Sequence, residues 1–331
     1  MKPLIQKLTE TFSPSGYESA VRDLIRAEVK SLADEVRVDA LGNLIVRKGS
    51  LAPRGKKIMI AAHMDEIGLM VSHVDENGFV RFSSIGGVFG KYIHGGRVRF
   101  LNGVQGVIGY DRFEKVHEAP ALDKVYIDVG ATSKKDCPVK VGDVAAFDRP
   151  FIEMGNRFVA KSMDDRVGVL VAIETLRALE STLHDVYFVF TTQEEVGTRG
   201  AGTSAFGVDP DVGIAIDVTS SADTPNAQKM EMALGKGPCV KIQDSGAISD
   251  PRVVQWMIRA AEKNKIPYQR EVLLFGGTDA HAIQMTRAGV PAGCLSVPTR
   301  YVHSPSEMVD YTDVQNSVKL MTALLRTPID L

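Results

Sequence analysis

Two adjacent glutamates, Glu194 and Glu195, follow an apolar segment that runs into Thr191, Thr192 and Gln193. A strand that simply ended in solvent would not need two acids side by side. Neighbouring side chains on an extended strand point in opposite directions, so the two carboxylates should face different atoms. We therefore expect one glutamate to bind a metal ion and the other to face the water that this ion activates.

Further acids and histidines stand just past the ends of predicted strands or at the start of a helix. In an open α/β sheet, ligands bind outside the carboxyl ends of the strands. These side chains can therefore converge in one crevice, although they are far apart in the sequence. They are His63, Asp65, Asp164, Asp165, Asp217 and His303.

The residue types indicate the chemistry. Two histidines and several carboxylates, without cysteine, suit divalent metals such as Zn²⁺, Co²⁺ or Mn²⁺. A histidine that binds a metal usually donates its second ring N–H to a carboxylate or carbonyl, which orients the ring. Asp65, two residues after His63, is placed for that role.

Each of these residues also has a structural explanation when it is taken alone. The glutamate pair fits a solvated strand end, and His63 fits a hydrogen-bonded core histidine. Asp164 and Asp165 fit helix N-cap positions, where aspartate is favoured. Asp217 alone fits a turn at a strand end. Only the combination of the motifs, in their order along the chain, favours a metal site.

The composition is that of an ordinary soluble globular protein. The chain has 331 residues, of which 44% are hydrophobic and 24% charged, and its formal net charge is −2. No basic excess indicates nucleic acid or an anionic membrane as a partner. Three isolated cysteines favour free thiols in a reducing cytosol. The N-terminal residues lack the apolar core of a signal peptide, and no apolar run could span a bilayer, so we expect a cytoplasmic protein.

The hydrophobic pattern alternates between strands and helices in two parts of the chain, which predicts a mostly parallel α/β sheet. Between these parts, residues 68–159 contain short alternating strands broken by glycine and asparagine, without a convincing helix, which favours a small β-barrel or sandwich. We predict a discontinuous α/β domain at 1–67 and 160–331, with a β-domain inserted at 68–159. The predicted strands lie at 36–49 (a hairpin), 56–65, 185–192, 212–219 and 292–299, and the predicted helices at 17–33, 162–181, 251–265, 278–289 and 311–326.

Five motifs together resemble a known family. AAHMDEIGLMV, SMDDRVG, TTQEEVGTRGA, AIDVT and YVHSPSE follow one another as do the metal-site motifs of the co-catalytic metallo-aminopeptidases, which include the tetrahedral (TET), deblocking and glutamyl aminopeptidases. The similarity extends over nearly the whole chain, including the β-rich insertion. It implies a zinc-exopeptidase-like sheet with helices on both faces and an inserted β-barrel.

The resemblance also implies a role for each site residue. One metal would be held by His63, Asp164 and Asp217, and a second by Asp164, Glu195 and His303. Asp164 would bridge the two metals, and its bond to Asp165 would be cis. Glu194 would be the general base. Asp65, which the His-x-Asp spacing places to orient His63, is counted with Glu194 among the catalytic residues.

The implied activity is release of N-terminal residues from unblocked peptides, with two Zn²⁺ or Co²⁺ ions per subunit activating a water. The resemblance implies that the β-domain mediates dimerisation and that dimers build a dodecamer. One alternative is a related dinuclear hydrolase of N-acyl amides, which would share these ligands. A glycoside hydrolase, a label that some family members have carried, would need two carboxyls and no metal, and the two histidines argue against it. A scaffold without catalysis would be expected to have lost ligands, and none is missing.

Two loops are expected to shape the substrate site. Residues 274–282 read as the entry to a helix, with Thr278 or Asp279 as its cap, and the resemblance places this loop near the active site. Together with residues 244–251, it is a candidate for the pocket that receives the N-terminal side chain.

Overall fold

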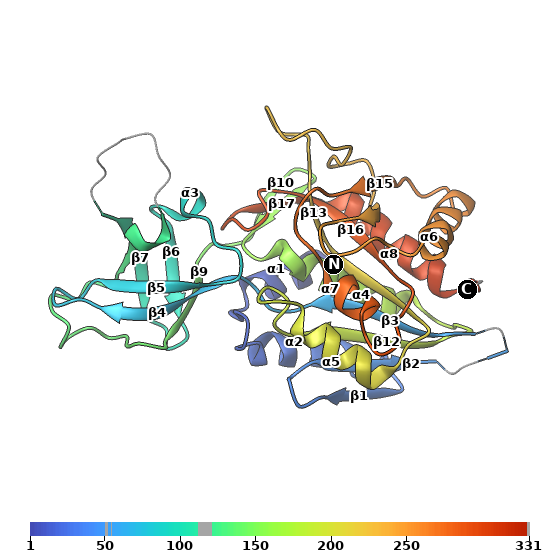
Figure 1. The fold of residues 1–331 in the computed structure, drawn as a ribbon, viewed down its shortest axis with the longest axis horizontal. Coiled ribbons are helices and arrows are strands. Elements are labelled where there is room, and N and C mark those ends of the chain that lie inside the picture. The colour runs from blue at the N-terminus through green and yellow to red at the C-terminus, as the bar shows by residue number, and fades with distance from the viewer. Residues whose placement is uncertain (50–51, 54, 112–120, 330–331) are drawn as a thin grey trace.

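The computed structural model describes residues 1–49, 52–53, 55–111 and 121–329. The chain forms two parts that lie side by side (Figure 1). A small β-barrel, in cyan and green on the left of the view, projects from a larger α/β domain, which contains both ends of the chain. This arrangement confirms the predicted fold class, an α/β sheet with an inserted barrel.

Four parallel strands form the centre of the large sheet, in the order β12, β3, β13 and β16. Their side chains are buried on both faces, as expected for strands covered by helices on each side. Parallel pairing places Thr191 beside His63 and Asp217 beside Ser296, so the carboxyl ends meet at one edge of the sheet. These strands are β3 (Lys57–His63), β12 (Asp185–Thr191), β13 (Val212–Ser220) and β16 (Ala292–Arg300).

Antiparallel strands extend the sheet on both sides of this parallel centre. The predicted hairpin forms β1 and β2, which add to the edge of β12. On the other side, β17, β11 and β10 follow β16, and the β14–β15 pair also joins β16. The added strands are β1 (Glu35–Val38), β2 (Leu44–Lys48), β10 (Ile152–Met154), β11 (Arg157–Ala160), β14 (Cys239–Gln243), β15 (Gln269–Val272) and β17 (Glu307–Asp310).

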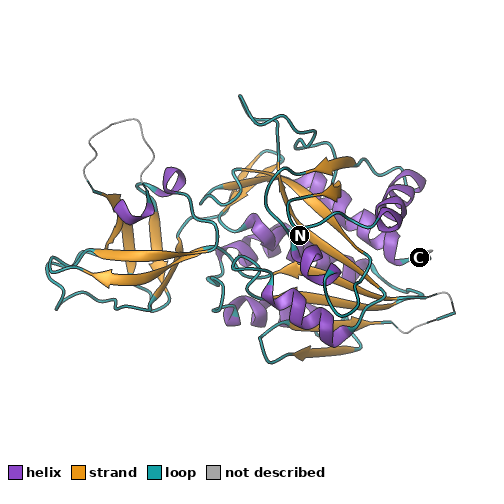
Figure 2. Cartoon of the chain, viewed as in Figure 1, coloured by secondary structure: helices purple, strands orange, loops and turns teal. Residues whose placement is uncertain are grey.

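Helices cover both faces of the sheet (Figure 2). Ile58 and Ile60 of β3 share one apolar core with five of the helices, whereas Met59 and Ala61 share another with two. This division follows from the alternation of side chains along a strand. The first face is covered by α1 (Lys2–Glu10), α2 (Ser19–Val29), α4 (Met163–Ala178), α6 (Pro251–Lys263) and α8 (Tyr311–Leu325), and the second by α5 (Arg199–Val208) and α7 (Asp279–Gln284).

The sequence pattern did not predict α1 or α5, and three other helices differ from their predicted extent. The α2 helix ends at Val29 rather than at residue 33. The α7 helix ends at Gln284 rather than near residue 289, because Arg287 and Gly289 have positive φ angles that an α-helix does not accommodate. The first residues of α4 are not helical: Asp164 and Asp165 have non-helical backbone angles, and the bond between them is cis, as the resemblance implied.

The inserted domain is a closed barrel of six strands with its own apolar core. Short loops and glycine turns connect the strands, together with a four-residue helix, α3 (Gly90–Ile93), and a 3₁₀ turn at Leu122–Lys124, which the sequence pattern did not predict. The barrel strands, in their order around the barrel, are β4 (Gly68–Val74), β5 (Val80–Ile85), β8 (Val125–Asp128), β7 (Gln105–Tyr110), β6 (Arg97–Phe100) and β9 (Val144–Phe147).

The last barrel strand ends at Phe147, before the domain boundary at residue 159 that composition suggested. Strands β10 and β11 lie in the large sheet, where β11 pairs with β17. We therefore infer that the inserted domain is about 68–147 and that the α/β domain resumes at once. No helix in the described part of the chain combines the length and apolar character needed to cross a bilayer.

Candidate metal centre

All five residues expected to bind metal converge at the carboxyl edge of the central strands. They form two groups whose ligand atoms lie within 4.8 Å of one another, and each group could hold a metal ion. The first group is His63, Asp164 and Asp217, and the second is Asp164, Glu195 and His303.

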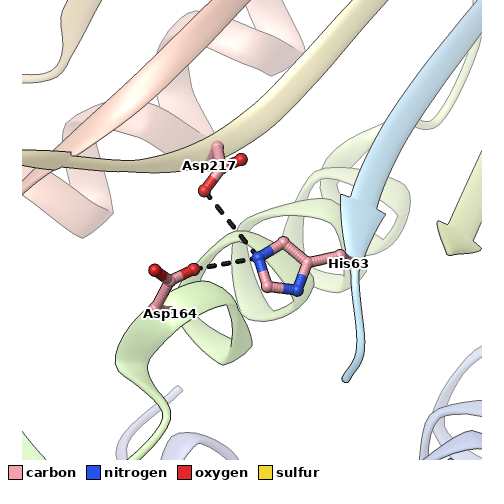
Figure 3. Close-up of side chains that lie close together, drawn as sticks. All are labelled: His63, Asp164 and Asp217. Atoms are coloured by element: carbon pink, nitrogen blue, oxygen red, sulfur yellow. Dashed lines mark hydrogen bonds and ion pairs between the residues drawn. The ribbon is translucent and has the colours of Figure 1, made fainter. Parts of the chain in front are cut away.

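The first group brings together three elements (Figure 3). His63 is the last residue of β3, Asp217 lies within β13, and Asp164 lies in the irregular start of α4. The Nε2 atom of His63 is 2.9 Å from Asp164 Oδ1 and 4.0 Å from Asp217 Oδ1. All three side chains are buried.

The second group uses the other oxygen of Asp164. The Nε2 atom of His303 is 3.3 Å from Asp164 Oδ2 and 3.3 Å from Glu195 Oε2. Asp164 therefore presents one oxygen to each histidine and is the residue that both groups share.

The second nitrogen of each histidine faces an acceptor. His63 Nδ1 lies 3.4 Å from Asp65 Oδ1, and His303 Nδ1 donates to the carbonyl of Gly87 over 2.9 Å. Such partners hold the ring and leave Nε2 free to bind a metal. The carbonyl of Gly87 belongs to the inserted domain, so the barrel contributes directly to the orientation of a candidate ligand.

Asp65 also organises the two glutamates. Its carboxylate accepts the backbone N–H groups of Glu194 (3.0 Å) and Glu195 (3.2 Å) and the hydroxyl of Ser15 (2.6 Å). The buried Asp65 thus links the β3 end to the loop that carries both acids.

Glu194 and Glu195 lie in a turn rather than on a strand, because β12 ends at Thr191 and Gln193 has a positive φ angle. The expected alternation along a strand is therefore not what separates them. Glu195 belongs to the second group, whereas Glu194 belongs to neither and has its Oε2 atom 3.9 Å from His63 Nε2.

Asp165 has a structural contact instead of a place in either group. One of its carboxylate oxygens accepts the backbone N–H of Gly168 over 3.0 Å, inside the first turn of the regular part of α4. Of the two adjacent aspartates, only Asp164 faces the histidines.

The site has more acids than its two histidines can balance. Burial, reinforced by the charges of neighbouring acids, raises the pKa values of Asp217 and Glu194 well above their ordinary range, and raises that of Glu195 to about 7. Burial acts against protonation of His303, but the charges of Glu195 and Asp164 outweigh it and raise its pKa to about 10. This surplus of negative charge in a buried site is what a divalent cation would neutralise.

Burial also opposes ionisation of Asp164, but hydrogen bonds to His303 and His63 outweigh it and lower the pKa of this carboxyl below its usual value. The pKa of His63 is raised well above its usual value: burial opposes this, and the hydrogen bonds to Asp164 and Asp65 overcome it. Asp164 is therefore the most firmly ionised acid of the pair of groups.

Sequence reasoning missed Glu307. Its two oxygens accept the backbone N–H of Asp164 over 2.9 Å and that of His303 over 2.8 Å, so one buried side chain holds two candidate ligands in place. Burial raises the pKa of Glu307 well above its ordinary value. The only sequence signal was its position four residues after His303 in the YVHSPSE motif.

A cavity of about 570 Å³ opens over both groups. The loop at residues 276–278 lines it, as the resemblance implied, and the hydroxyl of Thr278 caps α7 by accepting the N–H of Ala280. Gly246, from the second loop expected to shape the pocket, also lines the cavity, as do Gly87 and Phe89 from the barrel.

Comparison with known proteins identifies the class. Residues 42–320 match the M42 glutamyl aminopeptidase family, and the chain belongs to that family. It is 44% identical to a putative aminopeptidase of Acetivibrio thermocellus over 324 residues, which cover 97% of each chain.

Solved structures show the same fold. Aminopeptidase APDkam598 of Desulfurococcus kamchatkensis matches with a TM-score of 0.93 and 43% identity, covering 98% of this chain and 94% of that one. The TET1 peptidase of Pyrococcus horikoshii, which can assemble into a tetrahedron or a large octahedral shell, matches with a TM-score of 0.87 and 34% identity over 98% and 99%. These matches confirm the family resemblance and support a peptide-bond hydrolase.

Proposed function

We propose that this protein is a dinuclear metal-dependent aminopeptidase that releases N-terminal residues from unblocked peptides. The observation that carries the proposal is the pair of three-residue groups joined by Asp164, beneath an open cavity. Glu194, partly buried beside the groups but outside both, supplies the additional acid that hydrolysis requires.

The residues fit two divalent cations. The donors are imidazole nitrogens and carboxylate oxygens, which suit Zn²⁺ or Co²⁺. The Oε1 atom of Glu195 is buried without a hydrogen-bond partner among the described residues, and buried acids outnumber buried bases around it. When bound, two such cations would polarise the scissile carbonyl and lower the pKa of a water at the site.

The chain's own residues would supply the proton transfer. Glu194 would take a proton from the attacking water on its carboxylate and later deliver it to the leaving amine. The raised pKa of Glu194 in the bare site reflects burial and neighbouring acids, which bound cations would offset. Asp65 would keep Glu194 in place by accepting a hydrogen bond from the Glu194 backbone N–H.

The competing proposal is a hydrolase of N-acyl amides, which would use the same ligands. The test compares hydrolysis of aminoacyl p-nitroanilides with that of their N-acetylated analogues by the metal-loaded protein. We expect cleavage of the free-amine substrates and little of the acetylated ones. Cleavage of the acetylated compounds alone would reject the aminopeptidase proposal.

We also propose that the chain self-associates through the inserted barrel, as a dimer and in a dodecamer. Support comes from the relative of Pyrococcus horikoshii that assembles into closed shells. The barrel also exposes large apolar side chains, among them Leu101, Val107 and Val141. Light scattering of the purified protein measures the mass directly, and a monomer at micromolar concentration would contradict the proposal.

A further inference from the structure

The inserted barrel reaches into the cavity over the candidate metal centre. After β5, the chain passes Glu195 and His303 so closely that side chains would not fit. A Cβ atom on Gly86 would lie 3.0 Å from Glu195 Cβ, and one on Gly87 would lie 2.4 Å from His303 Nδ1. This close approach carries the next aromatic residue, Phe89, to the cavity wall.

Phe89 presents an apolar ring beside a polar site. It is 49% exposed, lines the cavity, and stacks near the His303 ring, with 6.2 Å between ring centroids and 30° between the planes. Tyr92 lies at its edge, 6.2 Å away between centroids. Half of a large aromatic surface is therefore left uncovered next to a candidate ligand.

On the side of Asp217, the cavity is lined by polar, buried side chains. Thr219 and Lys241 line it, yet they are only 1% and 2% exposed. Thr219 lies two residues beyond Asp217 on β13, so this side of the cavity lies next to the first metal group. The Lys241 ammonium is 3.1 Å from Glu271 Oε1, and this buried ion pair holds the Lys241 side chain in place.

The buried lining beside Asp217 and the exposed Phe89 ring beside His303 define a direction for the substrate. Because Asp164 joins the groups, two bound cations would place the scissile bond between the Asp217 side and the His303 side. An exopeptidase needs a bounded site for the one residue that it removes and an open path for the remaining chain. The buried, polar lining at Thr219 and Lys241 suits the residue that is removed. The exposed ring of Phe89 suits the path of the remaining chain.

We infer that Phe89 is the specificity-determining contact for the residue that follows the scissile bond. This inference rests on the aminopeptidase function proposed above. Aromatic rings pair favourably in stacked or edge-to-face geometry, so an aromatic residue at that position should be preferred over glycine by about 3- to 10-fold in kcat/KM. The barrel thereby selects part of the substrate as well as orienting His303.

The experiment uses the metal-loaded full-length protein and three substrates with the same N-terminal residue, chosen as the one released fastest from aminoacyl p-nitroanilides. Two are dipeptide amides with phenylalanine or glycine after the scissile bond. The third is the aminoacyl amide, which lacks that residue and reports any general change in catalysis. The readout is the ratio of kcat/KM for the phenylalanine and glycine peptides.

Phe89→Ala should reduce this ratio to near one, whereas Phe89→Tyr, which keeps the ring, should preserve it. The matched control is Phe206→Ala on α5, which removes an aromatic side chain that is 58% exposed and does not line the cavity. It should leave the ratio at the wild-type value. Thermal unfolding and light scattering of each variant show whether it is folded and assembled as the wild type.

An unchanged ratio in Phe89→Ala would overturn the inference, and so would an equal loss on all three substrates, which would mean that the ring acts only through His303. An altered particle mass with an unchanged ratio would place Phe89 in an interface between subunits instead. A wild-type protein that cleaves none of the three substrates would reject the proposed function itself, before any variant is compared.

Discussion

Two clusters of charged side chains share the segment at residues 161–166, and they are built on opposite principles. The first, which we call the paired cluster, consists of Glu66, Lys161 and Arg166. Lys161 Nζ is 2.5 Å from one oxygen of Glu66, and Arg166 Nη2 is 3.6 Å from the other. All three side chains are almost fully buried.

The second, which we call the acid-rich cluster, is the candidate metal centre together with Glu194, the general base that we propose. Its two histidines face four carboxylates, and its members are His63, Asp164, Glu194, Glu195, Asp217 and His303. Burying a charge is costly unless a partner compensates it. The paired cluster finds its partners within the chain, whereas we propose that the acid-rich cluster is completed by cations from solution. On this proposal the first cluster fixes structure, and the second binds metal.

The largest expected effect is that of removing metal, which should affect only the acid-rich cluster. Chelation should abolish peptidase activity, and Zn²⁺ or Co²⁺ should restore it. Added metal at about 100 times its Kd should stabilise the metal-free protein by about 2.7 kcal/mol for each site that it fills, measured by thermal or urea unfolding.

Asp164→Asn is the matched variant for this test, since Asp164 belongs to both groups. It should lose the stabilisation by metal while remaining folded. Full activity of a protein shown by metal analysis to be free of metal would contradict the difference drawn between the two clusters.

Glu194→Gln should separate catalysis from binding within the acid-rich cluster. The amide cannot accept the proton from water, so kcat should fall at least about 10²-fold. The bound-metal content should stay at the wild-type value, because Glu194 is outside both groups. Glu231→Gln, at an exposed glutamate, is the control. An unimpaired Glu194→Gln enzyme would show that the base is another residue.

Removing one member of the paired cluster should cost stability rather than affinity for metal. Lys161→Met leaves the buried Glu66 with the Ser13 backbone N–H and the more distant Arg166, and we expect a loss of about 3 kcal/mol in the free energy of unfolding. Lys2→Met is the control: its pair with Glu153 is about half exposed, so its loss should be within about 1 kcal/mol.

Urea unfolding of the metal-free proteins measures both values. Equal small losses in the two variants would mean that the paired cluster contributes no more than a surface ion pair.

The smallest effect concerns a partly exposed pair that provides a reference for both clusters. Arg300 binds Asp223 through two 2.8 Å contacts. Burial opposes ionisation of Asp223, but the hydrogen bonds from Arg300 and from the Leu234 backbone outweigh it and lower its pKa to about 2.

A lowered folded-state pKa gives stability that is present above the unfolded-state value and is lost as the pH falls through the folded-state value. Allowing for solvent screening, Asp223→Asn should cost about 1 kcal/mol near neutral pH and progressively less below about pH 4. Urea unfolding across this range checks the trend, and a cost that is independent of pH would contradict it.

The central strands were predictable because each is a short apolar run that ends in a polar residue. The runs before His63 and Glu194 could be located from sequence for this reason. The strands β10, β11 and β17 were not, because segments of three or four residues carry too little periodicity and form only by pairing with one another and with β16.

The five candidate ligands could be named in advance because they occur in ordered motifs, each next to a strand or helix end. Their supporting contacts could not. Ser15 lies 50 residues from Asp65, and Gly87 lies 216 residues from His303 in another domain. A serine hydroxyl or a backbone carbonyl gives no sign in the sequence of which distant side chain it will meet.

Strands β4 and β9 are neighbours in the barrel, with Leu69 opposite Ala145. The chain therefore departs for the insertion and returns from it at almost the same point, so a short linker could replace the whole barrel without pulling the large sheet apart. Such a shortened protein would nevertheless lose the acceptor for His303 Nδ1, because Gly87 would be deleted with the barrel. The path of the chain would allow the insertion to be removed, but His303 would then lose the contact that orients it as a metal ligand.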